Sequence, residues 1–328
     1  MARSPTHDFS IKRCAILAGM KGVVLAAGKG TRLYPITHQI AKPLLPLANR
    51  PTLEYAFDQF RSMGIDEVCV VVGENEPQIR GALGGGRQFG LRLSYARQTE
   101  PKGLAHALSF AEEFVSGAPF VLYLGDVVYS EDFQRHAERF LDSDCANLNI
   151  VKWVEDPRRF GVANLDGDRI VKLVEKPANP ESNYAMAGMY FFREAIWKVL
   201  PTLQPSARGE FEITDAIQAL VSQGNDVRAG VFEGEWFDTG TLESFLSTSA
   251  YLVGGGALID PAAAVDCELG PNVVVGPGAR VKAEKLENTV VFAGARVEGG
   301  SFSGCLIAGG HRRNGQINSE ILSEAGPN

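Results

Sequence analysis

An apolar run followed by a glycine-containing turn, in the stretch KGVVLAAGKGTRLYPITHQIAKPLLPL (residues 21–47), constrains the fold more than any other feature. The run VVLAA at 23–27 is short enough for one buried strand. The turn GKGTR at 28–32 contains two glycines, which let the backbone approach a ligand closely and adopt positive φ, so that several N–H groups can converge on phosphate oxygens. Arg32 and Lys42 add the cations that a triphosphate needs. The stretch therefore predicts a buried strand that ends in a phosphate-binding turn.

Two widespread phosphate-binding motifs do not fit this stretch. A P-loop requires G-x-x-x-x-G-K-[ST], and the residues after Gly28 have a different spacing. A dinucleotide-binding motif requires a third glycine, but Leu33 occupies that position. A bare G-x-G is most often a tight turn between a strand and a helix, so this simpler interpretation stays open at this point.

Strand-like apolar runs alternate with helical patterns along residues 20–253. The predicted strands occupy 68–72, 91–96 and 119–124, with helices between them. This alternation predicts an α/β fold with a Rossmann-like, mostly parallel sheet covered by helices on both faces. Further along the chain, the dipeptide DG at 166–167 is a strong hairpin-turn signal.

Two aspartates follow predicted strands and are candidate metal ligands. Asp126 comes directly after a fully apolar strand, where an uncompensated charge would be costly, and Asp238 precedes a Thr-Gly turn. Mg²⁺ takes one or two carboxylates, several waters and substrate phosphates, so this pair would suit it. The simpler alternative is that each aspartate closes a turn or caps a helix. Sequence alone does not bring the two together in space.

The composition is that of an ordinary globular chain of 328 residues with a net charge of −7. This acidic balance argues against nonspecific binding to nucleic acid. The five cysteines are scattered, with no C-x-x-C, which predicts reduced thiols and a cytoplasmic location. No run approaches the roughly 20 apolar residues of a membrane span.

The two ends of the chain have a different texture from the middle. Residues 254–310 are rich in Gly, Ala and Val, with an aliphatic residue about every sixth position, which predicts a short parallel β-helix of about three coils. Residues 311–328 are expected to form a frayed tail. Residues 1–19 are interpreted as an N-terminal extension, with Met20 as the functional start, and we expect their deletion to leave folding and activity intact.

The opening motif G-x-G-T-R-L-x-P-x-T…K-P resembles the signature of sugar-phosphate nucleotidyltransferases, and further matching motifs extend over most of residues 20–250. These are GLAHA at 103–107, LGD at 124–126, RFGV at 159–162, EKP at 175–177, SNYA at 182–185, RGEFEITD at 208–215 and WFDTG at 236–240. Within the family, the chain is most similar to the long form of the glucose-1-phosphate thymidylyltransferase branch, which carries a C-terminal left-handed β-helix. The resemblance implies an enzyme that forms a nucleoside diphosphate sugar and pyrophosphate from a nucleoside triphosphate and a sugar 1-phosphate. The implied pair is dTTP and glucose 1-phosphate, in a homo-oligomeric enzyme.

The resemblance also implies a role for each matching residue. The nucleotide would contact Leu25, Gly28, Gly30, Thr31, Gln98 and Gly103, with Gln98 and Gly103 reading the base edge. Three cations would act in catalysis: Arg32 and Lys42 on the departing pyrophosphate, and Lys176 on the sugar phosphate. The sugar would contact Gly161, Glu175, Tyr190 and Trp236, although Tyr190 and Trp236 are also typical core aromatics. Asp126 and Asp238 would hold Mg²⁺.

Several alternatives stay open. Transfer of uridylyl or guanylyl groups to another sugar 1-phosphate fits the same motifs. A catalytically silent subunit that only binds nucleotide sugars fits the fold, and Val127, where the family commonly has Asn, is its one sequence hint. Lys102 replaces an acidic residue of the short form close to the predicted base site. The β-helix alone would also suit an acyltransferase, but the only histidine near the repeats is His311, at their end.

Overall fold

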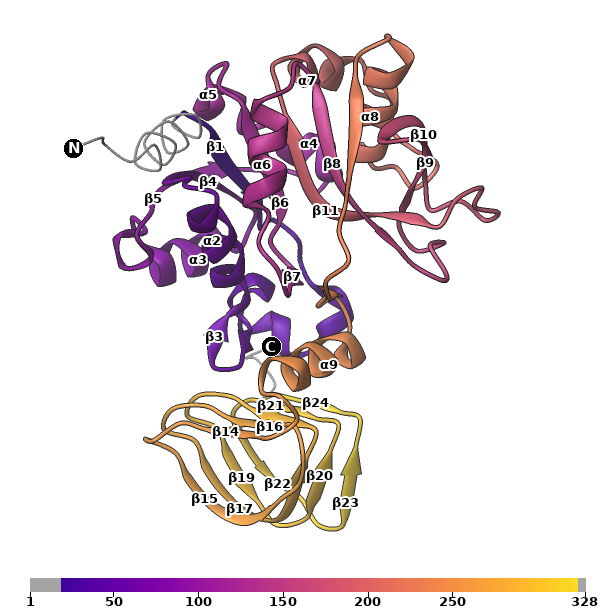
Figure 1. Cartoon of the computed structure of the whole chain (residues 1–328). Coiled ribbons are helices and arrows are strands. Elements are labelled where there is room, and N and C mark those ends of the chain that lie inside the picture. The colour runs from indigo at the N-terminus through magenta and orange to yellow at the C-terminus, as the bar shows by residue number, and fades with distance from the viewer. Residues whose placement is uncertain (1–18, 324–328) are drawn as a thin grey trace, which may run out of the picture. The chain divides into compact units, whose positions relative to one another are not determined.

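The computed structural model describes residues 19–323, which form two compact units (Figure 1). Unit 1 contains the chain up to Gly28, together with Ala56–Gly125 and Tyr129–Trp236. Unit 2 contains Lys29–Tyr55, Asp126–Val128 and the chain from Phe237 onward. Nearly all of the predicted extension (1–19) and the last five residues of the predicted tail lie outside the described residues. Within the described part, no helix combines the length and the apolar character needed to cross a membrane.

A nine-stranded sheet forms the centre of unit 1, in the order β5-β4-β1-β6-β11-β8-β12-β10-β9. The strands are β1 (Lys21–Leu25), β4 (Glu67–Val72), β5 (Arg92–Arg97), β6 (Phe120–Leu124), β8 (Asn147–Trp153), β9 (Gly161–Asp166), β10 (Arg169–Glu175), β11 (Tyr184–Phe192) and β12 (Val227–Val231). The first four are parallel to one another, because helical crossovers connect them. Strand β11 is antiparallel to both β6 and β8, so the second half of the sheet is mixed. The predicted α/β fold with a Rossmann-like parallel sheet is confirmed for the first half of unit 1.

The predicted hairpin joins β9 and β10. Asp166 pairs with Arg169 across the turn, and Gly167 adopts a φ of 61° there. Positive φ costs glycine nothing, which explains why the DG signal marks the turn correctly. The hairpin places Gly161, at the start of β9, opposite Glu175, at the end of β10.

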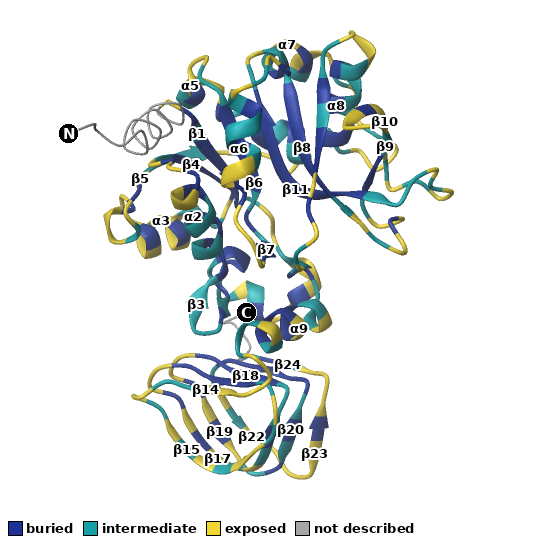
Figure 2. Cartoon of the chain, viewed as in Figure 1, coloured by how far each residue is buried: buried dark blue, intermediate teal, exposed yellow. Residues whose placement is uncertain are grey.

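Helices cover the sheet, and its central strands β1, β4, β6 and β11 are almost entirely buried, as Figure 2 shows. Within residues 19–323, the α-helices are α2 (Thr52–Ser62), α3 (Glu76–Leu83), α4 (Leu104–Ser109), α5 (Glu112–Val115), α6 (Gln134–Leu141), α7 (Ala195–Val199), α8 (Ile213–Ser222) and α9 (Leu242–Leu252). Helix α8 shows why they pack here. Its buried residues Ile213, Ala216, Ile217 and Leu220 follow helical spacing and share one core cluster with sheet residues such as Leu173.

A parallel β-helix forms most of unit 2. One side stacks β14 (Ala257–Ile259), β16 (Val273–Val275), β18 (Thr289–Val291), β21 (Leu306–Ile307) and β24 (Ile321–Leu322). The others contain β15 (Ala264–Leu269), β17 (Arg280–Glu287), β19 (Arg296–Glu298), β20 (Ser301–Ser303), β22 (Gly310–Arg312) and β23 (Gln316–Asn318). Ala257 pairs with Val273, which pairs with Thr289, so one coil takes sixteen residues. The strands continue past residue 310 to Leu322, which gives five stacked layers rather than about three coils.

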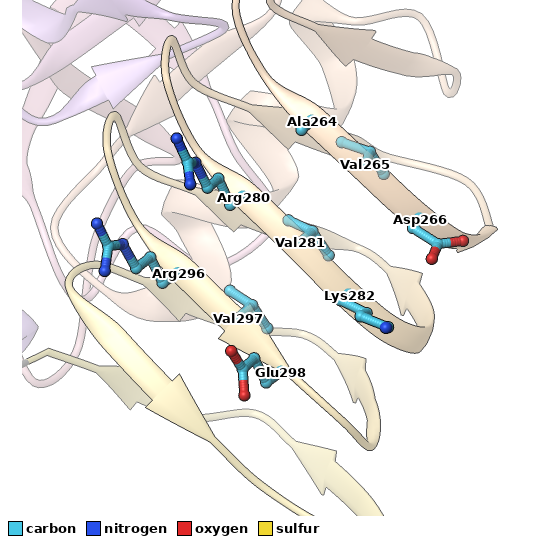
Figure 3. A pocket seen from close by; sticks show the side chains of 9 residues that line it. All are labelled: Ala264, Val265, Asp266, Arg280, Val281, Lys282, Arg296, Val297 and Glu298. Carbon is cyan, nitrogen blue, oxygen red and sulfur yellow. The ribbon is translucent and has the colours of Figure 1, made fainter.

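One outer face of the β-helix carries charged side chains in register (Figure 3). Asp266, Lys282 and Glu298 are successive neighbours and alternate in sign, whereas Arg280 and Arg296 are neighbours of the same sign. Cross-strand pairs of opposite charge stabilise a sheet and like charges destabilise it. The alternating column therefore favours the observed register.

The opposite side of the β-helix is covered by other parts of unit 2. In β16, Val273 and Val275 belong to the interior cluster of the β-helix, while Val274 belongs to a second cluster with Leu33 and Phe245. Leu33 lies in the segment 29–55 and Phe245 in α9. This double burial explains the run of three valines, because neither face of the strand is exposed to water. The segment 29–55, which packs on this strand through Leu33, also carries Arg32 and Lys42.

Candidate active site

The turn after β1 has the local geometry that its glycines predict. Gly30 adopts a φ of 66°, and a Cβ at this position would lie 2.9 Å from Lys42 Cβ and 3.1 Å from Thr37 Cγ2. The Thr37 hydroxyl donates to the Gly30 carbonyl at 2.9 Å. Gly28 differs, because nothing lies within 4 Å of the Cβ that it lacks. Gly30 is therefore required by the fold itself, whereas Gly28 is not.

Two cations and two carboxylates gather in unit 2, and we call Arg32, Lys42, Asp126 and Asp238 the phosphate cluster. The Lys42 ammonium, which is mostly buried, forms an ion pair with Asp126 Oδ2. Arg32 Nη2 and Asp238 Oδ1 both lie over Gly240, at 2.7 and 2.9 Å from the position that a Cβ would take there. A side chain at 240 would therefore displace both groups.

Hydrogen bonds from Thr239 hold the backbone of Asp126 next to that of Asp238. Thr239, next to Asp238, donates both its backbone N–H (3.0 Å) and its hydroxyl (2.8 Å) to the carbonyl of Asp126. Burial, and then the charge of Asp126, raise the pKa of Asp238, while Lys42 and Arg32 oppose this shift. Burial also acts to raise the pKa of Asp126, but its partner Lys42 outweighs that effect and holds this pKa below its ordinary value. The structure thus brings together two acids that are distant in sequence.

The phosphate cluster fits a divalent cation. After burial, the negative charge of Asp126 is the next cause of the raised pKa of Asp238, and a dication between the two carboxylates would remove that repulsion. No group of three or more metal-ligating side chains exists within residues 19–323. Mg²⁺ does not need one, because it usually binds one or two carboxylates and completes its shell with water and phosphate oxygens.

Unit 1 holds a second polar group around Glu175. Thr214 donates its hydroxyl to Glu175 Oε2 at 2.6 Å, and Arg208 Nη2 lies 3.3 Å from Oε1. Across the hairpin, a Cβ at Gly161 would lie 2.7 Å from Thr214 Oγ1, so glycine leaves space beside this carboxylate. Sequence reasoning assigned no role to Arg208 or Thr214, although both lie in the RGEFEITD motif that it used. The motif was therefore the sequence signal from which a role for Arg208 and Thr214 could have been predicted.

Two cations lie beside the same carboxylate. Lys176 Nζ is 3.1 Å from Glu175 Oε1, and Lys176 itself adopts a φ of 43°, which is uncommon for a residue other than glycine. Arg208 Nη2 is held more closely by the buried Glu212, at 2.7 Å. Backbone strain of this kind costs on the order of 1 kcal/mol and clusters at functional sites. The strained backbone of Lys176 therefore supports a functional role for this residue.

The predicted base-reading residues lie together in unit 1. Gln98 is buried and donates from Nε2 to the Gly103 carbonyl at 3.2 Å. Gly103 has a φ of 104°, and a Cβ here would lie 2.6 Å from the Phe211 carbonyl oxygen. Phe211 also bonds through its backbone to Lys102 and Ala105, so the loop is fixed at both sides of Gly103. The Lys102 side chain forms an ion pair with Glu100 at 2.7 Å.

The remaining predicted contacts are buried to different degrees. Leu25, at the end of β1, and Tyr190, in β11, both belong to the main core cluster, and Tyr190 is only 3% exposed. This placement favours the core interpretation of Tyr190. Trp236 packs on Phe160 with ring centroids 4.6 Å apart, and its buried indole N–H has no partner in the described residues. Val127 is buried at the start of β7 (Val127–Tyr129), which pairs with β13 (Trp236–Asp238).

Known proteins match the chain over the region that contains these residues. The family model described as Nucleotidyl transferase matches residues 21–253. The low-salt glycan biosynthesis nucleotidyltransferase Agl11 of Haloferax volcanii is 42% identical over 70% of this chain. A glucose-1-phosphate thymidylyltransferase of Streptomyces griseus is 44% identical, also over 70% of this chain. The chain spans 65% of the length of each of these two relatives.

A solved structure agrees with these matches. A Bacillus anthracis protein, assigned as a glucose-1-phosphate thymidylyltransferase and solved with sucrose, superposes with a TM-score of 0.67 and is 35% identical. The superposition covers 71% of this chain and 94% of that protein. Because the family model covers well over half of the sequence, the chain belongs to the nucleotidyl transferase family.

Proposed function

We propose that the chain transfers a nucleotidyl group from a nucleoside triphosphate to a sugar 1-phosphate, with dTTP and glucose 1-phosphate as the substrates. The phosphate cluster is the observation that carries this proposal. It combines two cations with two mutually repelling carboxylates, Asp126 and Asp238, in one place. That combination suits a metal-bound triphosphate, and the names of the relatives support the choice of base and sugar.

The reaction needs no protein nucleophile. A phosphate oxygen of the sugar 1-phosphate attacks the α-phosphorus, the bond from the α-phosphorus to the bridging oxygen of the β-phosphate breaks, and pyrophosphate leaves with that electron pair. Arg32 and Lys42 would neutralise the departing charge, and the backbone N–H groups at Gly28, Gly30 and Thr31 would bind phosphate oxygens. Fixed charges of this kind, together with orientation of the reactants, supply most of the catalysis in phosphoryl transfer.

Members of this family generally need a divalent metal, and we propose Mg²⁺. Asp126 and Asp238 would hold it, and when bound it would supply positive charge to the phosphate oxygens. The chain's own part is to keep both carboxylates ionised and close together. Lys42 keeps Asp126 ionised, and Thr239 holds the backbone of Asp126 beside Asp238. Lys42 and then Arg32 oppose the rise in the pKa of Asp238 that burial and Asp126 cause.

The polar group around Glu175 supports a sugar-binding role in unit 1. Glu175 can accept from sugar hydroxyls beside the space that Gly161 leaves, and the unpartnered indole N–H of Trp236 could donate to another. Lys176 would bind the sugar phosphate, and Arg208 offers a second cation beside it.

A cytoplasmic location and homo-oligomer formation stay predictions from the sequence alone.

The test is pyrophosphate release with Mg²⁺, crossing dTTP, UTP, GTP, CTP and ATP against several sugar 1-phosphates. We expect strong turnover of dTTP with glucose 1-phosphate, which is lost in D126A and retained in D156N, a control at an exposed aspartate paired with Arg158. Turnover of another pair would keep the mechanism and reassign the substrates. Binding of nucleotide sugars without any turnover would contradict the proposal and favour a silent binding subunit.

A further inference from the structure

His106 contacts the residue that is proposed to read the base. Its ring atom Nδ1 lies 3.0 Å from Gln98 Nε2, in addition to the 3.2 Å contact between that Nε2 and the Gly103 carbonyl. A carbonyl oxygen can only accept a hydrogen bond, so the Gln98 atom beside it must be the amide nitrogen. The two contacts together hold the side chain of Gln98 in this orientation.

This orientation also determines the state of the histidine. The amide nitrogen of Gln98 carries two hydrogens, and one of them is donated to Gly103. The other points to His106 Nδ1, which must accept it, so the imidazole proton sits on Nε2. Both donors of Gln98 are then used within the protein. Its oxygen Oε1 receives no donor from any described residue, so it is the group left to meet a ligand.

Aromatic neighbours hold the imidazole in this position. His106 meets Phe110 edge-on, with centroids 5.1 Å apart, and stacks on Phe211 at 6.2 Å. Phe211 is in turn bonded through its backbone to both Lys102 and Ala105. The ring is thus fixed by the same residue that closes over Gly103, and its acceptor atom has a fixed direction.

We infer that His106 is a positioning residue that makes Gln98 a pure acceptor and so selects a pyrimidine with a ring N–H. Thymine and uracil present a donor at N3, whereas cytosine presents a lone pair there, which would repel Gln98 Oε1. This role for His106 rests on the proposed function and explains how that function would select its base. Without an acceptor at position 106, only the Gly103 carbonyl would hold the Gln98 amide nitrogen, so the amide would turn more readily and present its nitrogen to cytosine.

Two variants separate the acceptor from the ring. H106F keeps an aromatic ring between Phe110 and Phe211 but lacks the acceptor, and H106Q loses the ring but offers an amide oxygen. We measure kcat and KM for dTTP and for dCTP with glucose 1-phosphate. H106F should lower the ratio of kcat/KM for dTTP over dCTP on the order of tenfold, mainly through KM for dTTP, because one hydrogen-bond preference is lost. H106Q should restore most of the ratio.

The outcomes distinguish this inference from the proposed function. An active wild-type protein whose dTTP/dCTP ratio is unchanged in H106F would overturn the inference alone, because a purely structural histidine would slow both nucleotides equally. A wild-type protein that is inactive with every nucleotide would overturn the proposed function and this inference with it. Should H106F fail to fold in a thermal melt, H106L removes the same acceptor with less bulk and takes its place under the same criteria.

Discussion

Single residues in the phosphate-binding turn differ in what they contribute. Gly30 has both a left-handed φ and no room for a Cβ, since Lys42 and Thr37 fill that space. Gly28 has neither restriction, and glycine at this position would let a ligand approach the backbone closely. Steric and ligand-binding demands on the two glycines can therefore be separated by experiment.

We expect G30A to destabilise the protein by about 1–3 kcal/mol, from strain at positive φ and from pressure on Lys42. G28A should leave stability unchanged but raise KM for the nucleoside triphosphate. Urea denaturation and pyrophosphate-release kinetics on both variants test this. Equal stability of the two variants would show that the φ of Gly30 imposes no cost.

Thr214 allows a test of the group around Glu175. T214V keeps the side-chain shape but removes the donor that lies 2.6 Å from the carboxylate, whereas T214S keeps the hydroxyl. We expect T214V to raise KM for glucose 1-phosphate about tenfold, because Glu175 loses one of the groups that orient it. KM for dTTP should stay within about twofold. A rise in both KM values, or an equal effect of T214S, would contradict this role.

At the scale of secondary-structure elements, α6 contains a titratable residue that couples stability to pH. Burial, and then the charge of Arg139, lower the pKa of His136 below its ordinary value of 6.5, with Glu131 acting weakly in the opposite direction. The ring packs so closely on β12 that a Cβ at Gly230 would lie 2.6 Å from its Nδ1. The folded state therefore keeps His136 neutral at a pH where the unfolded state binds a proton.

Stability should consequently fall as pH drops below the ordinary histidine pKa, since the unfolded state then binds more protons than the folded state. The H136Q variant lacks this titration. We expect the free energy of unfolding to fall more steeply between pH 7.5 and 5.5 in the wild type than in H136Q, by at most about 1.4 kcal/mol per pH unit. Urea denaturation at several pH values measures it, and parallel slopes would contradict it.

Elements with a clear apolar run could be predicted from sequence, and elements with buried polar residues could not. Strand β4 occupies 67–72 where 68–72 was predicted, because its valines need no distant partner to be recognised. Strand β8 was not predicted. It contains Asn147 and Asn149, which are buried but hydrogen-bonded to Phe191, to Arg228 and to each other. Such partners lie far away in sequence, so the local pattern does not show a buried strand.

In the candidate site, too, the local sequence identified single residues but not the contacts between distant ones. The motifs located Arg32, Lys42 and Asp126 individually, but their arrangement depends on contacts such as Lys42 with Asp126 and Thr239 with Asp126, over 80 residues apart. No role was assigned to Arg208 because an arginine beside two glutamates, Glu210 and Glu212, has no distinctive sequence pattern. Its third partner, Glu175, lies beside it only in the folded chain.

At the scale of the whole chain, the phosphate cluster and the β-helix belong to the same compact unit. Leu33 and Leu45, which lie next to Arg32 and close to Lys42, share a core cluster with Leu306 of the β-helix. The β-helix therefore contributes to the support of catalytic residues that precede it by more than 200 positions. The division into residues 20–253 and 254–310 stays a prediction about the sequence, because the described contacts group the chain differently.

Two neighbouring residues test this support. Leu306 faces the cluster with Leu33 and Leu45, whereas Ile307 faces the interior of the β-helix, and both are fully buried. L306A and I307A should each lower the free energy of unfolding by about 2–5 kcal/mol. Only L306A should also lower kcat/KM of the folded protein, by about tenfold or more, since small displacements of catalytic groups are costly.

Activity must be compared at equal folded fractions, which urea denaturation of each variant supplies. Equal kcat/KM in the two variants would mean that the β-helix stabilises unit 2 without positioning Arg32 and Lys42. A selective loss in L306A would mean that the segment 29–55 depends on the β-helix for its catalytic geometry. That outcome would also explain why a parallel β-helix is retained after a catalytic region whose family model ends at residue 253.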